Sequence, residues 1–255
     1  MFKKIFSLLL IMVMLFTGCT DKGVSTSKEN SNKEISTISD IVYKKNSADC
    51  EVYIKENGKY ESYYVLTENY NDSGCVLLLR KFLIDENIAF NSEDFPVSLY
   101  ENSILDNFLE KEFINVFDED FKNKLQEVEI DTIKKEFIRS AFPETTIIKR
   151  RIFALSFTEL GLSKSSTEPV EGKKLSFFPD GDSRIAYKSN GKASTWWTRT
   201  SHTWQTYLAC GFSPDGTLSA GEVTMENGVR PAFCLPSDTK IVKSEVEGKE
   251  VYVVE

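Results

Sequence analysis

The residues best suited to hold a ligand lie close together near the C-terminal end of the chain. The segment STWWTRTSHTWQTYLACGF, residues 194–212, contains every tryptophan and the only histidine of the 255 residues, namely Trp196, Trp197, Trp204 and His202. A flat aromatic face beside hydrogen-bonding groups is the usual composition of a surface that holds a small ligand. Trp204, His202 and Gln205 fall in a polar stretch typical of a loop, so these three residues are candidates for ligand binding.

The paired tryptophans precede this loop in a segment that is expected to be a strand. Side chains alternate along a strand, so Trp196 would point to one face while Trp197 and Arg199 point to the other. One of the two tryptophans is therefore expected in the core, and Trp197 and Arg199 join the candidates for ligand binding. Large aromatic side chains are mostly buried on average, so a loop that is simply pinned by Trp204 is the competing and more ordinary interpretation.

Two arginines lie in segments that are otherwise apolar, Arg199 in STWWTRT and Arg230 in GVRPAF. A planar guanidinium is the cation that most often pairs with carboxylates at buried and interfacial positions. Pairing with a carboxylate between strands is therefore the favoured role for both side chains. The alternative is that they hold an anionic ligand.

Four cysteines follow the N-terminal segment, at Cys50, Cys75, Cys210 and Cys234. An even number of cysteines in an exported chain permits two disulfides. Cys210 and Cys234 fall in expected strands on either side of residues 217–225, so they are a possible pair. The alternative is that all four are buried thiols that act as small hydrophobic residues.

The sequence gives little support for a metal site or a catalytic nucleophile. The single histidine excludes a histidine-rich metal site, and the segment FPDGDSR, with Asp180 and Asp182, resembles only the first residues of a calcium loop and lacks its closing glutamate. A turn is the favoured interpretation of that segment. A nucleophile motif such as G-x-S-x-G is not found in the sequence. We therefore expect no catalytic residues, no metal and no cofactor.

The N-terminal segment MFKKIFSLLLIMVMLFTGCT has the features of an export signal. Lys3 and Lys4 precede an apolar run, residues 5–16, that is shorter than the ~20 residues of a membrane-spanning helix. The following Thr17-Gly18-Cys19 resembles the lipobox of bacterial lipoproteins, although Phe16 replaces the usual leucine. This resemblance implies cleavage after residue 18 and a lipid on Cys19. The alternative is an ordinary secretory signal.

A polar stretch separates this signal from the rest of the chain. Residues 19–39 are rich in Ser, Thr, Lys, Glu and Asn, and they contain no aromatic side chain, which predicts a flexible tether with a reach of roughly 25 Å. Residues 40–255 suit a single domain. We thus expect a domain held on the outer face of the cell membrane. The net charge of −8 disfavours nucleic acid and anionic membranes as partners, and the oligomeric state stays open.

The elements that must position the candidate site are expected to be mixed. The patterns predict a hairpin about Asn57-Gly58, a buried strand in SGCVLLLRKFLI, and a helix over NSILDNFLEKEFINVF that is capped by Ser103. They also predict a second helix from Asp118 that includes Val128, strands from 196 to 235 with turns at 213–216 and 226–228, and a terminal hairpin, 239–255, about Gly248. In RRIFALSFTELG they predict a strand and a short helix, which Ser156 and Glu159 cap as a capping box and Gly161 ends. We therefore expect an α+β fold with antiparallel sheets and two or three helices in the middle of the chain.

Roughly residues 53–236 resemble an uncharacterised domain family of surface and secreted proteins in Gram-positive bacteria, although only the signature region, 194–236, is specific. The signature of that family is WWLRSPG followed by GVRPAL. Residues 228–232, GVRPA, match fully, and so do Trp196, Trp197 and Arg199. Thr198 replaces the leucine, and Ser201-His202 replaces Pro-Gly. That family is similar in turn to the C-type-lectin-like fold, which sugar-binding lectins share with formylglycine-generating enzymes.

The resemblance implies two functions of different class. The first is a non-enzymatic binding module that offers its loops to a glycan or a peptide, and we favour it. The second is an oxidoreductase that uses a cysteine pair with copper. The active cysteines of those enzymes lie close together in the sequence, whereas Cys210 and Cys234 are far apart. Because one fold can serve both functions, the choice depends on the site itself.

Overall fold

The structure, a computed structural model, describes residues 37–44, 50–162, 169–202 and 204–255. Strand predominates over helix, with 38% of these residues in strands and 14% in helices, and the main element is a large mixed sheet. The expectation of a C-type-lectin-like α+β fold with two or three helices is therefore wrong. The expected signal peptide, residues 1–18, lies outside the described residues, as does all of the tether before residue 37.

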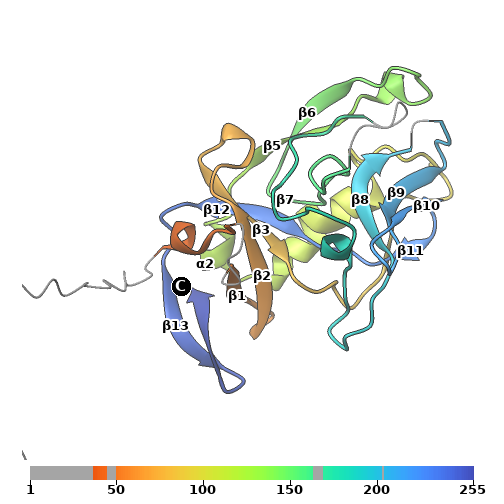
Figure 1. Ribbon diagram of the computed structural model, residues 1–255. Helices are drawn as coiled ribbons and strands as arrows, with labels where there is room; N and C mark the ends of the chain where they lie inside the picture. Colours follow the sequence, from red (N-terminus) through yellow and green to blue (C-terminus); the bar gives the residue numbers. More distant parts are fainter. Residues whose placement is uncertain (1–36, 45–49, 163–168, 203) are drawn as a thin grey trace, which may run out of the picture. The chain divides into compact units, whose positions relative to one another are not determined.

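The largest sheet has seven strands (Figure 1). Their order is β13 (Ile241–Val246), β14 (Lys249–Val254), β1 (Glu51–Glu56), β2 (Lys59–Thr67), β3 (Cys75–Arg80), β12 (Ala232–Pro236) and β7 (Ile152–Phe153). The pair of β1 and β14 is parallel and the other pairs are antiparallel, which makes the sheet mixed. All residues of β3 except Cys75 are buried, as its continuous apolar run predicts.

Both predicted hairpins are confirmed, because their turn residues adopt the left-handed backbone that such turns require. Asn57 and Gly58 join β1 to β2 with φ angles of 48° and 81°, and Glu247 and Gly248 join β13 to β14 with φ angles of 50° and 76°. Two consecutive residues with positive φ are the mark of the type I′ turn, whose twist matches that of the flanking strands.

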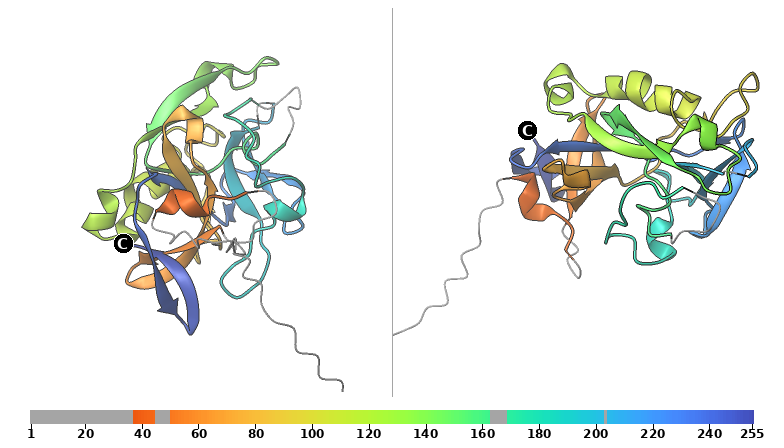
Figure 2. Two further views of the ribbon diagram at one scale, coloured as in Figure 1. Left: turned by 60° about the vertical axis from the view of Figure 1, so that its left-hand side comes forward. Right: turned by 90° about the horizontal axis from the view of Figure 1, so that it is seen from above.

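Three smaller sheets complete the strand content of the described residues (Figure 2). Their strands are β10 (Leu218–Glu222), β9 (Leu208–Phe212) and β8 (Trp196–Ser201) in one sheet, β11 (Glu226–Asn227) with β4 (Ile88–Ala89), and β5 (Val128–Ile133) with β6 (Thr145–Arg150). Of residues 226–228, expected as a turn, Glu226 and Asn227 instead form β11, because they pair with residues far away in the sequence, and Gly228 forms a bridge with Trp196.

The longest stretch of helical residues is one continuous segment. It runs through α1 (Ile104–Asn107), the π-helical turn η3 (Phe108–Glu112) and the 3-10 turn η4 (Phe113–Val116). The Ser103 hydroxyl accepts the Asp106 amide at 3.1 Å, so the predicted cap is confirmed. The expected second helix is only the short α2 (Glu119–Lys122), because the chain turns at Asn123 and Val128 already belongs to β5. Other 3-10 turns are η1 (Ile38–Ile41), η2 (Tyr70–Asp72), η5 (Lys135–Phe137) and η6 (Asp182–Arg184).

The segment after β7 keeps its predicted cap but not its predicted helix. The Glu159 carboxylate accepts the Ser156 amide at 2.9 Å, and the Ser156 hydroxyl accepts the Glu159 amide at 3.2 Å, which is the reciprocal geometry of a capping box. The chain then forms only turns as far as Gly161, whose φ of 81° ends the segment.

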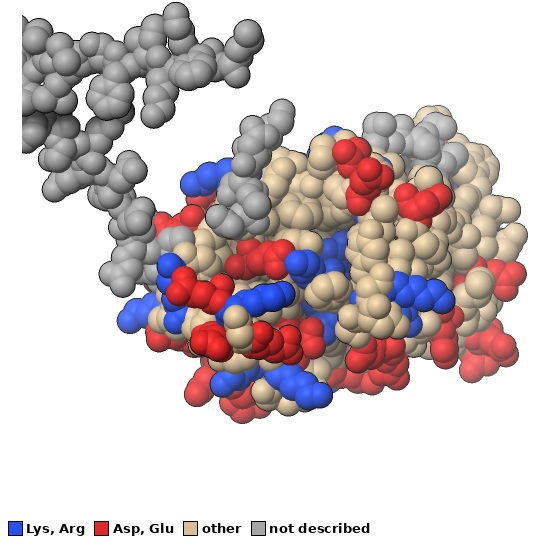
Figure 3. Space-filling model, turned by 60° about the horizontal axis from the view of Figure 1, so that its bottom comes forward, with Lys and Arg blue, Asp and Glu red and all other residues tan. Residues whose placement is uncertain are grey.

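Aromatic side chains fill the space between the helical segment and the large sheet. Phe233 of β12 contacts Tyr63, Phe117 and Phe121 at ring-centroid distances of 5.1, 5.5 and 5.8 Å. These contacts fix the helical segment against β12, which leads directly from the Arg230 segment. Among the described residues, no helix has the length and apolar character needed to cross a membrane. On the face drawn in Figure 3, acidic and basic side chains are interspersed rather than separated.

Candidate functional site

The two tryptophans of β8 are core residues. Trp196 and Trp197 are 0% and 1% exposed, because β8 is covered on both faces. The Trp196 ring stacks on Phe212 at 5.4 Å, and the Trp197 indole N–H donates to the Ile88 carbonyl at 2.9 Å. The prediction that one of them lies in the core is confirmed for both. The expectation that Trp197 contacts a ligand is therefore corrected, because its side chain is buried.

Arg199 is fully buried and makes a bidentate ion pair with Glu159, with N–O distances of 2.7 and 2.9 Å. Two more of its N–H groups reach the carbonyls of Asp131 at 2.8 Å and Ala154 at 3.0 Å. Four of the five N–H groups of this guanidinium are thus bonded within the protein, and the side chain is 0% exposed. Arg199 is therefore a structural residue that links β8 to β5 and to the segment after β7. The expectation that it binds a ligand is corrected.

Further buried polar groups surround this ion pair. The Tyr70 hydroxyl donates to Glu159 at 2.5 Å, and the Thr200 hydroxyl donates to the Glu171 carboxylate at 2.6 Å. Burial is the main reason why the pKa of Glu171 rises to about 8, and the nearby Arg199 only partly opposes it. Oε1 of Glu171 is buried without a hydrogen-bond partner. The sequence offered no sign that Glu171 and Tyr70 belong here, because they lie far from Arg199 along the chain.

Trp204 is the exposed tryptophan, as predicted. Its side chain is 54% exposed, and Tyr207, which the sequence analysis did not single out, is 48% exposed. The side-chain amide of the exposed Gln205 donates to the Tyr207 hydroxyl at 3.4 Å. The backbone N–H of Gln205 donates to Nδ1 of the half-buried His202 at 3.2 Å. The loop thus brings together the three candidates Trp204, His202 and Gln205 and adds a second aromatic ring.

Neighbouring loops are tied to the Trp204 loop by backbone hydrogen bonds. The Ser98 amide donates to the Thr206 carbonyl at 2.6 Å, and the Val223 amide donates to the Tyr207 carbonyl at 2.9 Å. The loop that contains Ser98 also presents Phe95, which is 44% exposed. We call the exposed rings of Trp204 and Tyr207, which lie in the same loop, the aromatic surface. Its backbone is anchored at Thr206, whose side chain is buried.

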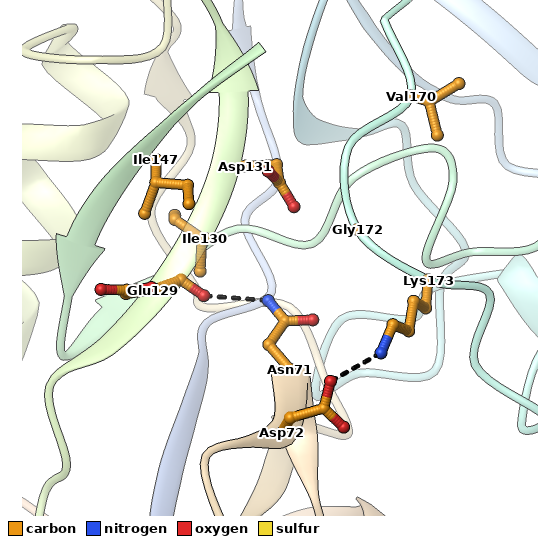
Figure 4. Close-up of a pocket in the computed structure, with 9 residues that line it drawn as sticks. All are labelled: Asn71, Asp72, Glu129, Ile130, Asp131, Ile147, Val170, Gly172 and Lys173. Carbon is orange, nitrogen blue, oxygen red and sulfur yellow. Dashed lines mark hydrogen bonds and ion pairs between the residues drawn. The ribbon is translucent and has the colours of Figure 1, made fainter.

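A separate pocket of about 310 Å³ lies between η2, β5 and the segment 170–173 (Figure 4). Its lining residues are Asn71, Asp72, Glu129, Ile130, Asp131, Ile147, Val170, Gly172 and Lys173. The Asn71 amide donates to the Glu129 carbonyl at 2.9 Å, and Lys173 pairs with Asp72 at 2.8 Å. Both members of this ion pair are 75% exposed, so it lies at the solvent side and contributes little stability.

Cys210 and Cys234 lie apart, and the segment at Asp180 is a turn. Cys210 lies in β9 and Cys234 in β12, strands of different sheets, and Cys234 is a buried free thiol. The disulfide considered for this pair is therefore not formed, and burial raises the pKa of the Cys234 thiol well above its usual range. The segment at Asp180 is a turn, as predicted, in which the Asp180 carboxylate accepts the Ser183 amide at 3.1 Å. Cys19 lies outside the described residues.

Across the described residues, no group of three or more His, Cys, Asp or Glu side chains is arranged to hold a metal ion. Comparison with known proteins finds one family model, described as a domain of unknown function (DUF6273), that matches residues 73–237. The matched range includes the aromatic surface, the Arg199–Glu159 pair and Arg230. Searches of curated proteins and of solved structures returned no match.

Proposed function

We propose a function from the site itself, since the chain belongs to the DUF6273 family, and the description of that family names no activity. The protein is a lipid-anchored binding protein whose domain holds a glycan outside the cell without chemically changing it. The observation that carries this proposal is the exposure of Trp204 and Tyr207, at 54% and 48%, in a domain whose other two tryptophans are core residues.

A glycan fits the chemistry of the aromatic surface better than other ligands do. Flat rings offer the apolar faces on which sugar rings stack, and Gln205 and His202 place hydrogen-bonding groups beside them. Sugars are mostly neutral, which suits a chain with a net charge of −8. An extended peptide is the other ligand that such a surface accommodates, and the binding screen below distinguishes the two.

The oxidoreductase alternative is less well supported. Reactive cysteines are thiolates, and thiolates occur in exposed or electropositive surroundings that lower the thiol pKa. The Cys234 thiol has the opposite surroundings, because it is buried and its pKa is raised. A cysteine pair for copper would also need Cys210 and Cys234 together, and these lie in different sheets.

We predict that Trp204→Ala weakens binding of soluble peptidoglycan fragments or other glycans by roughly 1–3 kcal/mol, the effect of losing an aromatic anchor. The free energy of unfolding should change by less than about 0.5 kcal/mol, because the side chain is largely exposed. Calorimetric titration of the full-length protein in detergent with a panel of glycans and peptides measures the first effect, and denaturant titration measures the second.

Phe142→Ala is the matched control, because Phe142 is an aromatic side chain that is 83% exposed and lies outside the aromatic surface. Its removal should leave binding unchanged, whereas Tyr207→Ala should weaken it as Trp204→Ala does. If Phe142→Ala and Trp204→Ala reduce binding equally, contact is non-specific and the proposed surface is wrong. Binding to peptides alone would replace the glycan with a peptide ligand.

For the anchor, we predict that the protein partitions into detergent and carries its lipid on Cys19, given the order of basic residues, apolar run and Gly18-Cys19. Cys19→Ala should release the protein into the medium or stall its processing. Mass spectrometry of the mature N-terminus is the measurement. An unmodified wild-type protein in the medium would contradict lipid anchoring.

A further inference from the structure

Arg230 is a buried arginine with an unused donor group. The residue is 2% exposed, and its Nε donates to the Arg80 carbonyl at 3.1 Å. Its Nη1 is buried and has no hydrogen-bond partner. Arginine is rarely buried to this extent unless its charge is paired. An unsatisfied N–H group on a charged side chain is costly, so this arrangement requires an explanation.

The other two buried arginines of the domain provide the comparison. Arg80 pairs with Glu56 at 2.8 Å and with Glu61 at 2.9 Å, and Arg199 pairs with Glu159. Arg230 has no ion pair with any carboxylate among the described residues. The favoured expectation that both signature arginines pair with carboxylates is thus confirmed for Arg199 and wrong for Arg230.

Aromatic rings take the place of a carboxylate around Arg230. Its guanidinium carbon lies 5.3 Å from the centre of a Trp196 ring and 6.0 Å from the centre of the Tyr64 ring. Ring faces attract a cation but accept no conventional hydrogen bond, so they leave Nη1 unsatisfied. Burial lowers the pKa of Arg230 to about 10, and the group therefore still carries its charge at neutral pH.

The backbone around Arg230 holds this guanidinium in place. A Cβ atom on Gly228 would lie 2.7 Å from a methyl group of the buried Leu83 and 3.0 Å from the Thr195 carbonyl oxygen, so a larger residue would require these neighbours to shift. On the other side, the Pro231 carbonyl accepts the Arg80 amide at 2.9 Å. A donor fixed in this way loses little conformational entropy when a ligand binds.

We infer that Arg230 is an anion-binding residue, whose Nη1 group donates to an oxygen of a carboxylate or phosphate. Tyr64 is the expected point of entry, because its ring covers Arg230 and is only half-buried. Lys81 lies 5.6 Å from the centre of the same ring and adds positive charge there, although Glu51 pairs with it at 2.6 Å. A guanidinium matches the geometry of both oxyanions. This site is separate from the aromatic surface, so neither proposal depends on the other.

The inference is tested on the full-length protein in detergent by adding sodium acetate or inorganic phosphate at constant ionic strength. The expected result is a saturable shift of the Arg230 side-chain N–H signals in the NMR spectrum, together with a rise in the unfolding midpoint. At an anion concentration ten times the dissociation constant, the equilibrium constant for unfolding should fall about tenfold. A response to one anion but not the other identifies the ligand class.

Three variants make the test specific. Arg230→Met should abolish the anion-dependent rise in the unfolding midpoint, whereas the control Arg139→Met, which removes an exposed arginine, should keep it. Tyr64→Ala should strengthen the response, because it uncovers the guanidinium without removing it. The inference is overturned if Arg230→Met responds as the wild type does. It is equally overturned if neither the wild type nor Tyr64→Ala shows a saturable shift, a result that does not require Arg230→Met to fold.

Discussion

Glu159→Gln is expected to destabilise the domain by about 3–5 kcal/mol, because it leaves the buried Arg199 charge without its counter-charge. The Glu159 carboxylate accepts two hydrogen bonds from Arg199, one from Tyr70 and one from the Ser156 amide. A neutral amide cannot accept all of these bonds. Denaturant titration at neutral pH measures the effect.

An exposed ion pair supplies the control for this result. Lys134 and Glu144 pair at 2.8 Å, but the Glu144 side chain is 58% exposed, so Glu144→Gln should cost less than about 1 kcal/mol. Replacing both buried partners, as Arg199→Met with Glu159→Leu, should recover most of the stability lost in the single variant. A loss below about 1 kcal/mol for Glu159→Gln would show that the ion pair does not organise the interior.

The second large effect is a loss of stability as the pH rises, caused by Glu171. Its pKa is about 8 in the folded protein, against an ordinary value near 4.5, so the folded state keeps a proton that the unfolded chain releases. The contribution of Glu171 to stability is therefore greatest below about pH 4.5 and is lost as the pH rises to about 8. Each unit of pKa difference corresponds to about 1.4 kcal/mol, which gives an upper estimate of about 4–5 kcal/mol.

Glu171→Gln should remove this contribution, because glutamine resembles the protonated carboxyl and does not titrate. The measurement is the free energy of unfolding of both proteins between pH 5 and pH 9, and the quantity of interest is their difference. That difference should grow in favour of the variant as the pH rises. Arg199, Glu159 and Thr200 surround Glu171 and are unchanged, so a difference that stays constant with pH would show that Glu171 is already ionised when folded.

Local features of the fold could be predicted from the sequence because their causes lie within a few residues. Asn57-Gly58 and Gly248 specify the two hairpins by their tolerance of positive φ, and Ser103 specifies a helix start by its side-chain oxygen. The alternating pattern predicted that one of Trp196 and Trp197 is buried, and the polar pattern predicted that Trp204 is exposed. That both tryptophans of the pair are buried did not follow from the alternation.

The overall fold could not be predicted, because it depends on contacts between distant segments. The pattern after Asp118 suited a longer helix, but Val128 is drawn into β5 by its pairing with β6, and the helix stops at Lys122. The same limit applied to the site. Glu159 was recognised as a capping residue, yet nothing in its surroundings in the sequence indicated that it pairs with Arg199. The sequence also could not show that Arg230 has no carboxylate to pair with, because a pattern of residue types does not reveal which carboxylates are near in space.

The most direct test of the proposed function is acrylamide quenching of tryptophan fluorescence, with and without soluble peptidoglycan fragments. Trp196 and Trp197 are buried, so the fraction of the fluorescence that acrylamide quenches readily should come from Trp204 and should disappear in Trp204→Ala. A ligand stacked on the aromatic surface shields that fraction, and quenching should fall as the fragments saturate the protein. If fragments that bind the domain leave the quenching of Trp204 unchanged, the ligand lies elsewhere and the proposed surface is wrong.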